Sequence, residues 1–346
     1  MSDHAATHKP QSPIPMLDAR AYLADEHGAL EALSRELQSA LETVGFYYLT
    51  GHGVDDTLIA DAFSQCRAFH AQPLARKLAL KANEHNVGYM PLNGYVSRSS
   101  RVESAKKPNL VEAFFVKRDL APDHPHVLAN IRYRCANQWP SEMPGFRETV
   151  VAYCDAMEAL CKKLLPVYAL ALDLPAPFFD EAFSEPQYAL RMSHYPPAEA
   201  GDADQYGVAP HTDSSFLTML APSELPGLAI CTPDGQWFDA PSIPGAFTVN
   251  SGDMLRRWTN HRFLSTAHRA INRNPGQDRY SIPFFFDATF DFPMACLPTC
   301  QDANNPPRYE PTTYTDYMLW FARQYDHVRE QDRRNPKDPG VPASHR

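Results

Sequence analysis

Residues 211–220 read His-Thr-Asp-Ser-Ser-Phe-Leu-Thr-Met-Leu and join a polar triplet to an apolar run. The run is typical of a buried strand, and in an extended strand residues i and i+2 point to the same face. His211 and Asp213 would then offer an imidazole nitrogen and a carboxylate oxygen to one ion. On a helix they would diverge. No other His-x-Asp occurs in the chain, and a surface turn is the alternative interpretation of the triplet alone.

Short apolar runs on both sides of this stretch predict a β-rich core. They cover residues 189–195, 215–220, 227–231, 246–249, 265–272 and 280–287, and Pro, Gly and Asp turns separate them. Strands at this spacing are typical of a β-sandwich or barrel. The 32 prolines, 19 Phe and 16 Tyr, against only 15 glycines, also favour an all-β core over a doubly wound sheet.

A third metal ligand would have to come from another strand. His268 lies in the run Ser-Thr-Ala-His-Arg-Ala-Ile, residues 265–271, which a β core could bring beside residues 211–213. Two histidines and one carboxylate on one side of a metal leave the opposite side open, which is the arrangement of non-haem Fe(II) oxygenases. Taken alone, His268 is also compatible with a hydrogen-bonded structural role.

Arg279 and Ser281 form a second candidate site. They stand two apart in an apparent strand that continues Ile-Pro-Phe-Phe-Phe, so they share a face. A guanidinium binds a carboxylate through two parallel hydrogen bonds, and a hydroxyl adds a third. The pair could therefore hold one end of a dicarboxylic acid whose other end chelates a metal. A surface salt bridge is the alternative, although apolar residues flank the pair.

The first half of the chain shows a different pattern of apolar residues. Helical periodicity covers residues 29–44, 56–82 and 144–173, with a new segment beginning at Pro73 and a kink expected at Pro166. Residues 45–54 predict a buried strand, residues 83–110 a long loop, and residues 312–330 a final helix. We therefore expect one domain over residues 1–330, with a helix-rich part (1–185), a β core holding the metal site (186–295), and a flexible tail (331–346).

Composition excludes several classes of protein. The net charge of −9 argues against nucleic-acid binding. No run reaches 18 apolar residues, so we expect no membrane span, and the first 15 residues do not resemble a secretory signal. Seven cysteines without a Cys-x-x-Cys pair indicate free thiols and a cytoplasmic location. Nothing here decides between a monomer and a dimer.

Taken together, these motifs resemble those of Fe(II)/2-oxoglutarate-dependent dioxygenases of the isopenicillin N synthase-like family. The resemblance covers about residues 12–330. It rests on five ordered segments, namely GFYYLTGHGV (45–54), RMSHYPP (191–197), HTDSSFLTML (211–220), NSGDML with WTN (250–260, leading to His268), and Arg279-x-Ser281. It implies an α+β fold whose core is a distorted double-stranded β-helix, or jelly roll, with flanking helices.

The resemblance also implies roles for individual residues. His211, Asp213 and His268 would bind Fe(II), while Arg279, Ser281 and Tyr195 would bind the distal carboxylate of 2-oxoglutarate. In several relatives an Asn stands where this chain has Ser193, so a cosubstrate contact from that position is in doubt. The cofactors would be Fe(II), 2-oxoglutarate and dioxygen, and the reaction would couple oxidative decarboxylation to hydroxylation or desaturation of a small metabolite.

Substrate contacts in the family come from the loop near residues 86–118 and from the strand after Arg279. The candidates in this chain are aromatic or basic side chains, namely Tyr89, Tyr95, Arg98, Arg101, Phe115, Trp258 and Phe284. They favour a small carboxylate-bearing or aromatic substrate. A solvated basic surface and simple core filling are the alternatives for these residues.

Other functions remain compatible with the same residues. A family member that does not use 2-oxoglutarate, such as an oxidative cyclase, could use Arg279 and Ser281 for a substrate carboxylate. An ethylene-forming enzyme is a narrower variant. A metal-free binding jelly roll and a zinc hydrolase are rivals from other classes, but no residue suggests a general base for a hydrolase.

Overall fold

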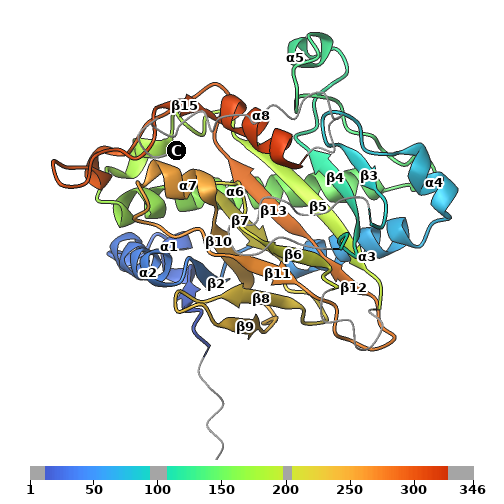
Figure 1. Cartoon of the computed structure of the whole chain (residues 1–346), viewed down its shortest axis with the longest axis horizontal. Helices are drawn as coiled ribbons and strands as arrows, with labels where there is room; N and C mark the ends of the chain where they lie inside the picture. The colour runs from blue at the N-terminus through green and yellow to red at the C-terminus, as the bar shows by residue number, and fades with distance from the viewer. Residues whose placement is uncertain (1–11, 94–106, 198–204, 326–346) are drawn as a thin grey trace, which may run out of the picture.

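The computed structural model describes residues 12–93, 107–197 and 205–325, with side chains described up to residue 320. Its centre is a large mixed sheet that faces a smaller antiparallel one (Figure 1). The large sheet has the order β1-β2-β10-β7-β13-β5-β4-β3, and β12 pairs with β5 beside this path. Its strands are β1 (Met16–Asp18), β2 (Phe46–Thr50), β3 (Gly88–Met90), β4 (Glu112–Lys117), β5 (Gln187–Tyr195), β7 (Leu217–Leu220), β10 (Phe247–Ser251), β12 (Arg279–Ser281) and β13 (Pro283–Asp287).

The small sheet has the order β6-β11-β8-β9 and covers one face of the large sheet. Its strands are β6 (Val208–His211), β8 (Leu228–Cys231), β9 (Trp237–Ala240) and β11 (His268–Ala270). Phe46 and Tyr48 of β2 pack with Ile230 of β8 in one apolar cluster, which joins the two sheets at this end. A third, two-stranded sheet pairs β14 (Pro293–Met294) with β15 (Thr312–Thr313).

Helices cover the other face of the large sheet. The two longest are α2 (Ala29–Thr43) and α6 (Phe146–Ala171), which pack on each other, while α3 (Asp56–His70) packs against β5 and β12. Asp55 caps α3 by accepting a hydrogen bond from the Thr57 amide at 2.8 Å. The shorter helices are α1 (Arg20–Leu23), α4 (Leu74–Ala79), α5 (Pro125–Leu128), α7 (Asp253–Trp258) and α8 (Tyr314–Tyr325), with 3-10 turns at Ala176–Phe179 and Pro298–Cys300.

The structure only partly follows the predicted division into a helix-rich part (1–185) and a β core (186–295). Strands β1 to β4 come from the first 185 residues, and they complete the large sheet instead of forming a separate layer. The predicted loop over residues 83–110 contains β3, which pairs with β4. Pro166 does lie within α6, as expected. Among the described residues, strands from both parts therefore share one sheet, while the domain bounds of 1–330 stay a prediction.

Strand alternation decides which side chains face the small sheet. Across the large sheet, one row runs from Thr248 through Leu220 and Pro283 of β13 toward Arg191 and Phe115. The neighbouring row runs from Phe46 through Asn250, Thr218 and Phe285 to Ala189. Side chains of these two rows form the floor of a cavity between the sheets.

Candidate active site

The two histidines of the predicted metal site lie side by side in the small sheet. His211 ends β6 and pairs in register with His268, the first residue of β11. Their ring centroids are 4.3 Å apart. Asp213 follows the end of β6 and so lies just outside the strand that we expected to hold it. Its Oδ1 nevertheless lies 3.7 Å from Nε2 of His211 and 3.5 Å from Nε2 of His268. The three ligand atoms therefore converge on one point.

Hydrogen bonds fix which atoms of this cluster are available. Nδ1 of His211 lies 2.8 Å from the Ala209 carbonyl oxygen, and Nδ1 of His268 lies 3.1 Å from that of Thr266. A carbonyl oxygen only accepts, so each Nδ1 carries the proton and donates. A neutral ring then directs the lone pair of its Nε2 toward Asp213.

The carboxylate of Asp213 is held in the same way. Its Oδ2 accepts hydrogen bonds from Oγ1 of Thr218 at 2.7 Å and from Nδ2 of Asn250 at 2.8 Å. These two contacts leave Oδ1 directed at the histidines. Thr218 and Asn250 stand opposite each other on β7 and β10, so the large sheet orients the carboxylate while the small sheet supplies both imidazoles.

This geometry is electrostatically unfavourable without a positive charge at its centre. Two imidazole lone pairs and a carboxylate oxygen meet within 3.7 Å in a buried site. Burial, together with a smaller effect of neighbouring His268, lowers the pKa of His211 to about 4 although Asp213 opposes this shift. Burial opposes protonation of His268 as well, but Asp213 raises its pKa. Although burial disfavours the Asp213 carboxylate, the histidines and Asn250 lower its pKa. A divalent cation would relieve the repulsion, and this donor set suits Fe(II).

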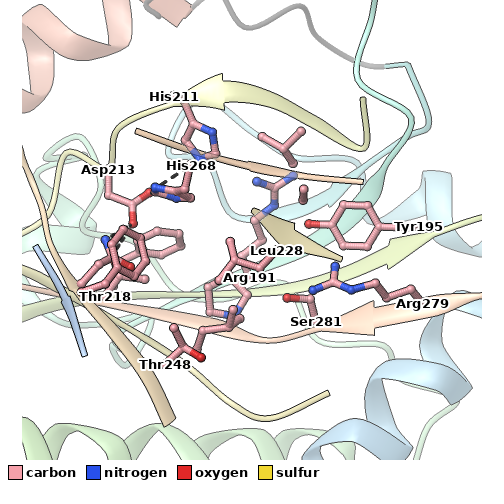
Figure 2. A pocket seen from close by; sticks show the side chains of 17 residues that line it. Arg191, Tyr195, His211, Asp213, Thr218, Leu228, Thr248, His268, Arg279 and Ser281 are labelled. Atoms are coloured by element: carbon pink, nitrogen blue, oxygen red, sulfur yellow. Dashed lines mark hydrogen bonds and ion pairs between the residues drawn. The ribbon is translucent and has the colours of Figure 1, made fainter. Parts of the chain in front are cut away.

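The second predicted site lies along the same cavity. Arg279 and Ser281 of β12 pair with Tyr195 and Ser193 of β5, so all four side chains lie on the cavity face of the two strands. Figure 2 shows Arg279, Ser281 and Tyr195 gathered at one end of the cavity, with the histidines and Asp213 at the other. The guanidinium carbon of Arg279 lies 4.9 Å from the centre of the Tyr195 ring.

Arg279 is a buried cation without a carboxylate partner among the described residues. It is 3% exposed, its Nε donates to the Leu225 carbonyl oxygen at 3.3 Å, and Nη1 has no hydrogen-bond partner. Burial lowers its pKa, although Tyr195 opposes this shift. A buried charge of this kind is costly unless an anion pairs with it. The site therefore suits a carboxylate.

Two glycines leave room for this site. A Cβ atom on Gly207 would lie 2.5 Å from Cδ1 of Tyr195, and one on Gly227 would lie 2.7 Å from Nε of Arg279. Any larger residue would thus collide with a side chain of the acid-binding group. Neither glycine was singled out from the sequence, because each lies outside the recognised motifs.

The cavity that joins the two sites is open to solvent and spans about 550 Å³, including the space at its mouth. Its walls are mixed, with polar groups near the histidines and near Arg279 and apolar ones between them. The remaining lining residues are Phe46, Arg191, Val208, Thr218, Leu220, Leu228, Thr248, Asn250, Ala270, Pro283 and Phe285. In Figure 2, Arg191 lies between the two histidines with Asp213 and the end of the cavity that holds Arg279.

Three predicted substrate contacts do not line the cavity, because their side chains point away from it. Phe284 lies on the opposite face of β13 from Phe285 and stacks on Tyr188 with ring centroids 5.2 Å apart. Trp258 packs in an aromatic cluster with Phe216 and other rings. The third is Tyr89 of β3.

Tyr89 is 1% exposed and donates its hydroxyl hydrogen bond to Glu112, away from the cavity. Phe115 contacts Arg191, which lines the cavity. The guanidinium carbon of Arg191 lies 5.6 Å from the centre of the Phe115 ring. The other three candidates, Tyr95, Arg98 and Arg101, lie outside the described residues.

Sequence reasoning missed two prominent cavity residues, Arg191 and Phe285. The signal was present in both cases. Counting by two from Arg279 and Ser281 reaches Phe285 and not Phe284, and counting back by two from Tyr195 reaches Ser193 and Arg191. The same alternation places Thr218 and Asn250 on the cavity floor, although nothing in the sequence showed that they would orient Asp213.

Comparison with known proteins gives the family. Residues 186–288 match the model of the 2OG-Fe(II) oxygenase superfamily, and residues 14–142 match that of the non-haem dioxygenase in morphine synthesis N-terminal region. The chain is 35% identical over 318 residues to hxnY of Emericella nidulans, a 2-oxoglutarate-Fe(II) type oxidoreductase, covering 90% of this chain and 89% of that protein. The chain therefore belongs to the 2OG-Fe(II) oxygenase superfamily.

Solved structures show the same fold. T7H of Neurospora crassa in complex with α-ketoglutarate and thymine superposes with a TM-score of 0.78 at 25% identity, covering 90% of this chain and 96% of T7H. A dioxygenase for auxin oxidation from rice gives 0.69 at 29% identity, covering 88% and 94%. The predicted α+β jelly roll is thereby confirmed.

The protein is accordingly an enzyme, a 2-oxoglutarate-dependent Fe(II) dioxygenase that uses Fe(II), 2-oxoglutarate and dioxygen. Nothing in the comparisons favours an enzyme that dispenses with 2-oxoglutarate. Among the described residues, no helix is both long and apolar enough to cross a membrane.

Proposed function

We propose that His211, Asp213 and His268 bind the iron through Nε2, Oδ1 and Nε2. The convergence of these three atoms is the observation that carries the assignment, since hydrogen bonds occupy the other polar atom of each side chain. The bound metal supplies the activation of dioxygen for oxidative decarboxylation of 2-oxoglutarate. Three protein ligands on one side leave positions for the cosubstrate and for dioxygen.

Arg279, Ser281 and Tyr195 would hold the distal carboxylate of 2-oxoglutarate. The unpaired Nη1 of Arg279 supports this role, as does the room that Gly207 and Gly227 leave around Tyr195 and Arg279. A guanidinium and two hydroxyls fix the orientation of the acid as well as its affinity. The opposite end of the molecule would then lie toward the histidines across the same cavity.

For the primary substrate, we propose a small molecule with an acidic or carbonyl oxygen next to an apolar or aromatic body. Arg191 is a second cation on the cavity floor, and Asp213 is the only carboxylate among the described lining residues. Phe285 adds an aromatic ring in the same row as Asn250, two strands away and beside Thr218. Arg191 would hold the polar oxygen while Phe285 packs against the body and the site hydroxylates or desaturates it.

Steady-state kinetics on an Arg191→Gln variant test this assignment. A panel of small aromatic, heteroaromatic and aliphatic acids, each with its neutral amide, is screened for stimulated succinate formation. For the best acid, the variant should raise KM by about tenfold or more, while the cosubstrate's own KM stays unchanged. Arg273→Gln, at an exposed pair with Asp239, is the matched control. A raised KM for 2-oxoglutarate instead would assign Arg191 to the cosubstrate.

We also propose a cytoplasmic location. All seven cysteines are free, and five of them are buried. Such thiols persist in a reducing compartment. Localisation of a tagged full-length chain by microscopy tests this proposal, and a secreted product would contradict it.

A further inference from the structure

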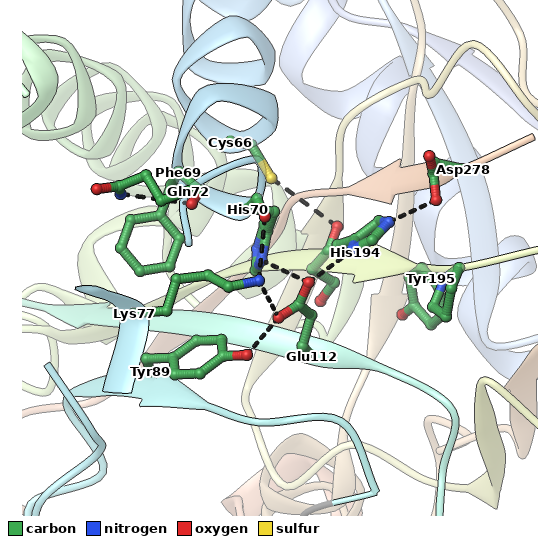
Figure 3. A network of polar contacts seen from close by, with 12 residues as sticks. Cys66, Phe69, His70, Gln72, Lys77, Tyr89, Glu112, His194, Tyr195 and Asp278 are labelled. Atoms are coloured by element: carbon green, nitrogen blue, oxygen red, sulfur yellow. Dashed lines mark hydrogen bonds and ion pairs between the residues drawn. The ribbon is translucent and has the colours of Figure 1, made fainter. Parts of the chain in front are cut away.

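A second polar cluster lies on the helix-covered face of the large sheet, behind the acid-binding residues (Figure 3). Its centre is Glu112 of β4, which is 3% exposed. One carboxylate oxygen, Oε1, lies 2.7 Å from Nδ1 of His194. The other, Oε2, accepts hydrogen bonds from Nζ of Lys77 at 2.7 Å and from the hydroxyl of Tyr89. None of these side chains lines the cavity.

His194 bridges two carboxylates. Its Nδ1 contacts Glu112 and its Nε2 lies 2.7 Å from Oδ1 of Asp278. An ionised carboxylate only accepts hydrogen bonds, and a neutral imidazole has a single N–H, so both contacts together require the doubly protonated ring. Burial opposes this charge, yet Glu112 and Asp278 raise the pKa of His194 above its ordinary value of 6.5. With Lys77, the four charges sum to zero.

His70 and Tyr280, which also contact His194, do not supply the positive charge between the two carboxylates in its place. His70 of α3 donates from Nε2 to the Met192 carbonyl oxygen at 2.9 Å, and burial lowers its pKa although Glu112 lies 3.5 Å from Nδ1. Tyr280 stacks on the imidazole of His194 with centroids 5.0 Å apart. Among the described residues, the titratable and charged groups around His194 and its carboxylates are His70, Lys77, Tyr89, Glu112, Asp278 and Tyr280, with Cys66 and Arg67 of α3 beside Tyr280.

A metal ion does not suit this cluster, although His70, Glu112 and His194 lie close enough to share one. Both oxygens of Glu112 already accept hydrogen bonds, one of them from buried Lys77. The Nε2 atoms of both histidines contact protein acceptors. Protons thus fill the positions that a cation would occupy, in contrast to the uncapped Nε2 atoms of His211 and His268.

The cluster is connected to the acid-binding site through two adjacent strands. On β5 and β12, His194 pairs with Tyr280, while Tyr195 pairs with Arg279 and Ser193 with Ser281. His194 therefore alternates with the cavity residues on the same strand. Asp278 directly precedes Arg279, so the hydrogen bond from His194 fastens the chain at the entry to β12. Moving that point would move the Arg279 guanidinium.

We propose that His194, held as an imidazolium between Glu112 and Asp278, is a positioning residue that fixes β12 and so sets the affinity of Arg279 and Ser281 for 2-oxoglutarate. This inference rests on the proposed role of Arg279. When His194 loses its proton, one of its two carboxylate contacts is lost, and the half-exposed Asp278 is the partner that water can replace.

The expected pH dependence follows from the sign of the shift. A histidine that gains carboxylate partners contributes fully while it is protonated, and this contribution is lost as the pH rises through its pKa in the folded protein. That pKa lies above 6.5. Affinity for 2-oxoglutarate should therefore fall as the pH rises above 6.5, by about threefold to fivefold, since a partly exposed ion pair contributes little more than this.

The test measures dissociation constants of the Mn(II)-loaded full-length enzyme for 2-oxoglutarate and for 2-oxobutyrate across this pH range. The second acid chelates the metal in the same way but has no distal carboxylate, so the ratio of the two constants isolates the Arg279 end. His194→Gln keeps a donor and an acceptor without a charge, and Asp278→Asn removes one carboxylate. Asp239→Asn, at an exposed pair with Arg273, is the control.

We expect the ratio to change with pH in the wild type and in the Asp239 control. In His194→Gln it should be constant at the weaker-binding value, with kcat for decarboxylation at saturating 2-oxoglutarate within about twofold. In Asp278→Asn the change should move to lower pH. A constant ratio in the wild type, or an unchanged pH dependence in His194→Gln, would overturn the proposal.

Failure of the proposed function looks different in the same experiment. Should Arg279→Leu leave the 2-oxoglutarate to 2-oxobutyrate ratio unaltered, Arg279 does not bind the distal carboxylate and the assignment of the acid site is wrong. If Arg279→Leu abolishes the preference while the His194 variants leave it untouched, the acid site stands and only the role of His194 fails.

Discussion

Replacing Arg279 by leucine should weaken cosubstrate binding without destabilising the apoprotein. The guanidinium is 3% exposed, donates a long hydrogen bond to the Leu225 carbonyl oxygen, and has no anionic partner among the described residues. Its burial therefore costs free energy until a carboxylate arrives. A leucine, which is shorter and uncharged, removes that cost along with the binding site.

The magnitude follows from the kind of contact that is lost. Removing one partner of a buried, hydrogen-bonded charge pair costs about 2–5 kcal/mol. At about 1.4 kcal/mol for each factor of ten, the dissociation constant for 2-oxoglutarate should rise by about 30-fold to several thousand-fold. The free energy of unfolding of the apoprotein should stay within about 1 kcal/mol of the wild type, or increase.

Thermal unfolding with Mn(II), with and without 2-oxoglutarate, measures both quantities. At about 100 times its wild-type dissociation constant, the ligand should stabilise the wild type by about 2.7 kcal/mol and the variant by about 0.9 kcal/mol or less. Arg262→Leu is the contrasting control, because Arg262 pairs with Glu42 and Asp173 and should lose stability but keep the ligand response. An Arg279→Leu apoprotein that unfolds several kcal/mol more easily would refute the reasoning, since Arg279 would then be a structural residue.

Two further expectations concern neighbouring side chains. Phe284→Ala should lower the free energy of unfolding by about 3–5 kcal/mol because the ring is fully buried. Phe285→Ala should lower it by only about 1 kcal/mol and should instead lower kcat/KM for the primary substrate, because this ring lines the cavity. Equal effects of the two variants in denaturant titrations would contradict the assigned faces. Asp287 is buried, and burial raises its pKa to about 6 although Tyr314 and the Phe216 amide oppose this. The folded state therefore binds its proton more tightly than the unfolded state, so stability should fall by on the order of 3 kcal/mol as the pH rises from about 4 to 6. Asp287→Asn should remove this slope, and a slope of the same size in the variant would exclude Asp287 as its source.

The sequence was most informative where local periodicity and residue chemistry agree. Helices near residues 29–44 and 144–173 follow from apolar spacing, and their observed bounds differ by only a few residues. Strands β5, β7, β8, β10, β11, β12 and β13 overlap the short apolar runs after residue 186, whereas β6 and β9 lie outside those runs. Strand β4 was missed because it lies between β3 and β5 and carries Glu112, so it has no simple alternation of apolar and polar side chains.

The site could be predicted only in part for a related reason. Residue type and spacing single out His211, Asp213 and His268, and the register between β6 and β11 then brings the histidines together. Which phenylalanine faces the cavity depends on whether the alternation of side chains in β12 continues unbroken through Ile282 into β13. It does, so Phe285 shares the face of Arg279 and Ser281, and Phe284 lies on the opposite face. The contacts of Glu112 join segments far apart in the chain, and no local pattern encodes them.

The most direct test of the metal assignment is a crystal structure of the Fe(II)-loaded protein with 2-oxoglutarate, prepared without oxygen, with anomalous data at the iron edge. One peak should lie between Nε2 of His211, Nε2 of His268 and Oδ1 of Asp213, with the distal carboxylate of the acid on Arg279. A peak among His70, Glu112 and His194, or an iron that does not touch Asp213, would contradict the account.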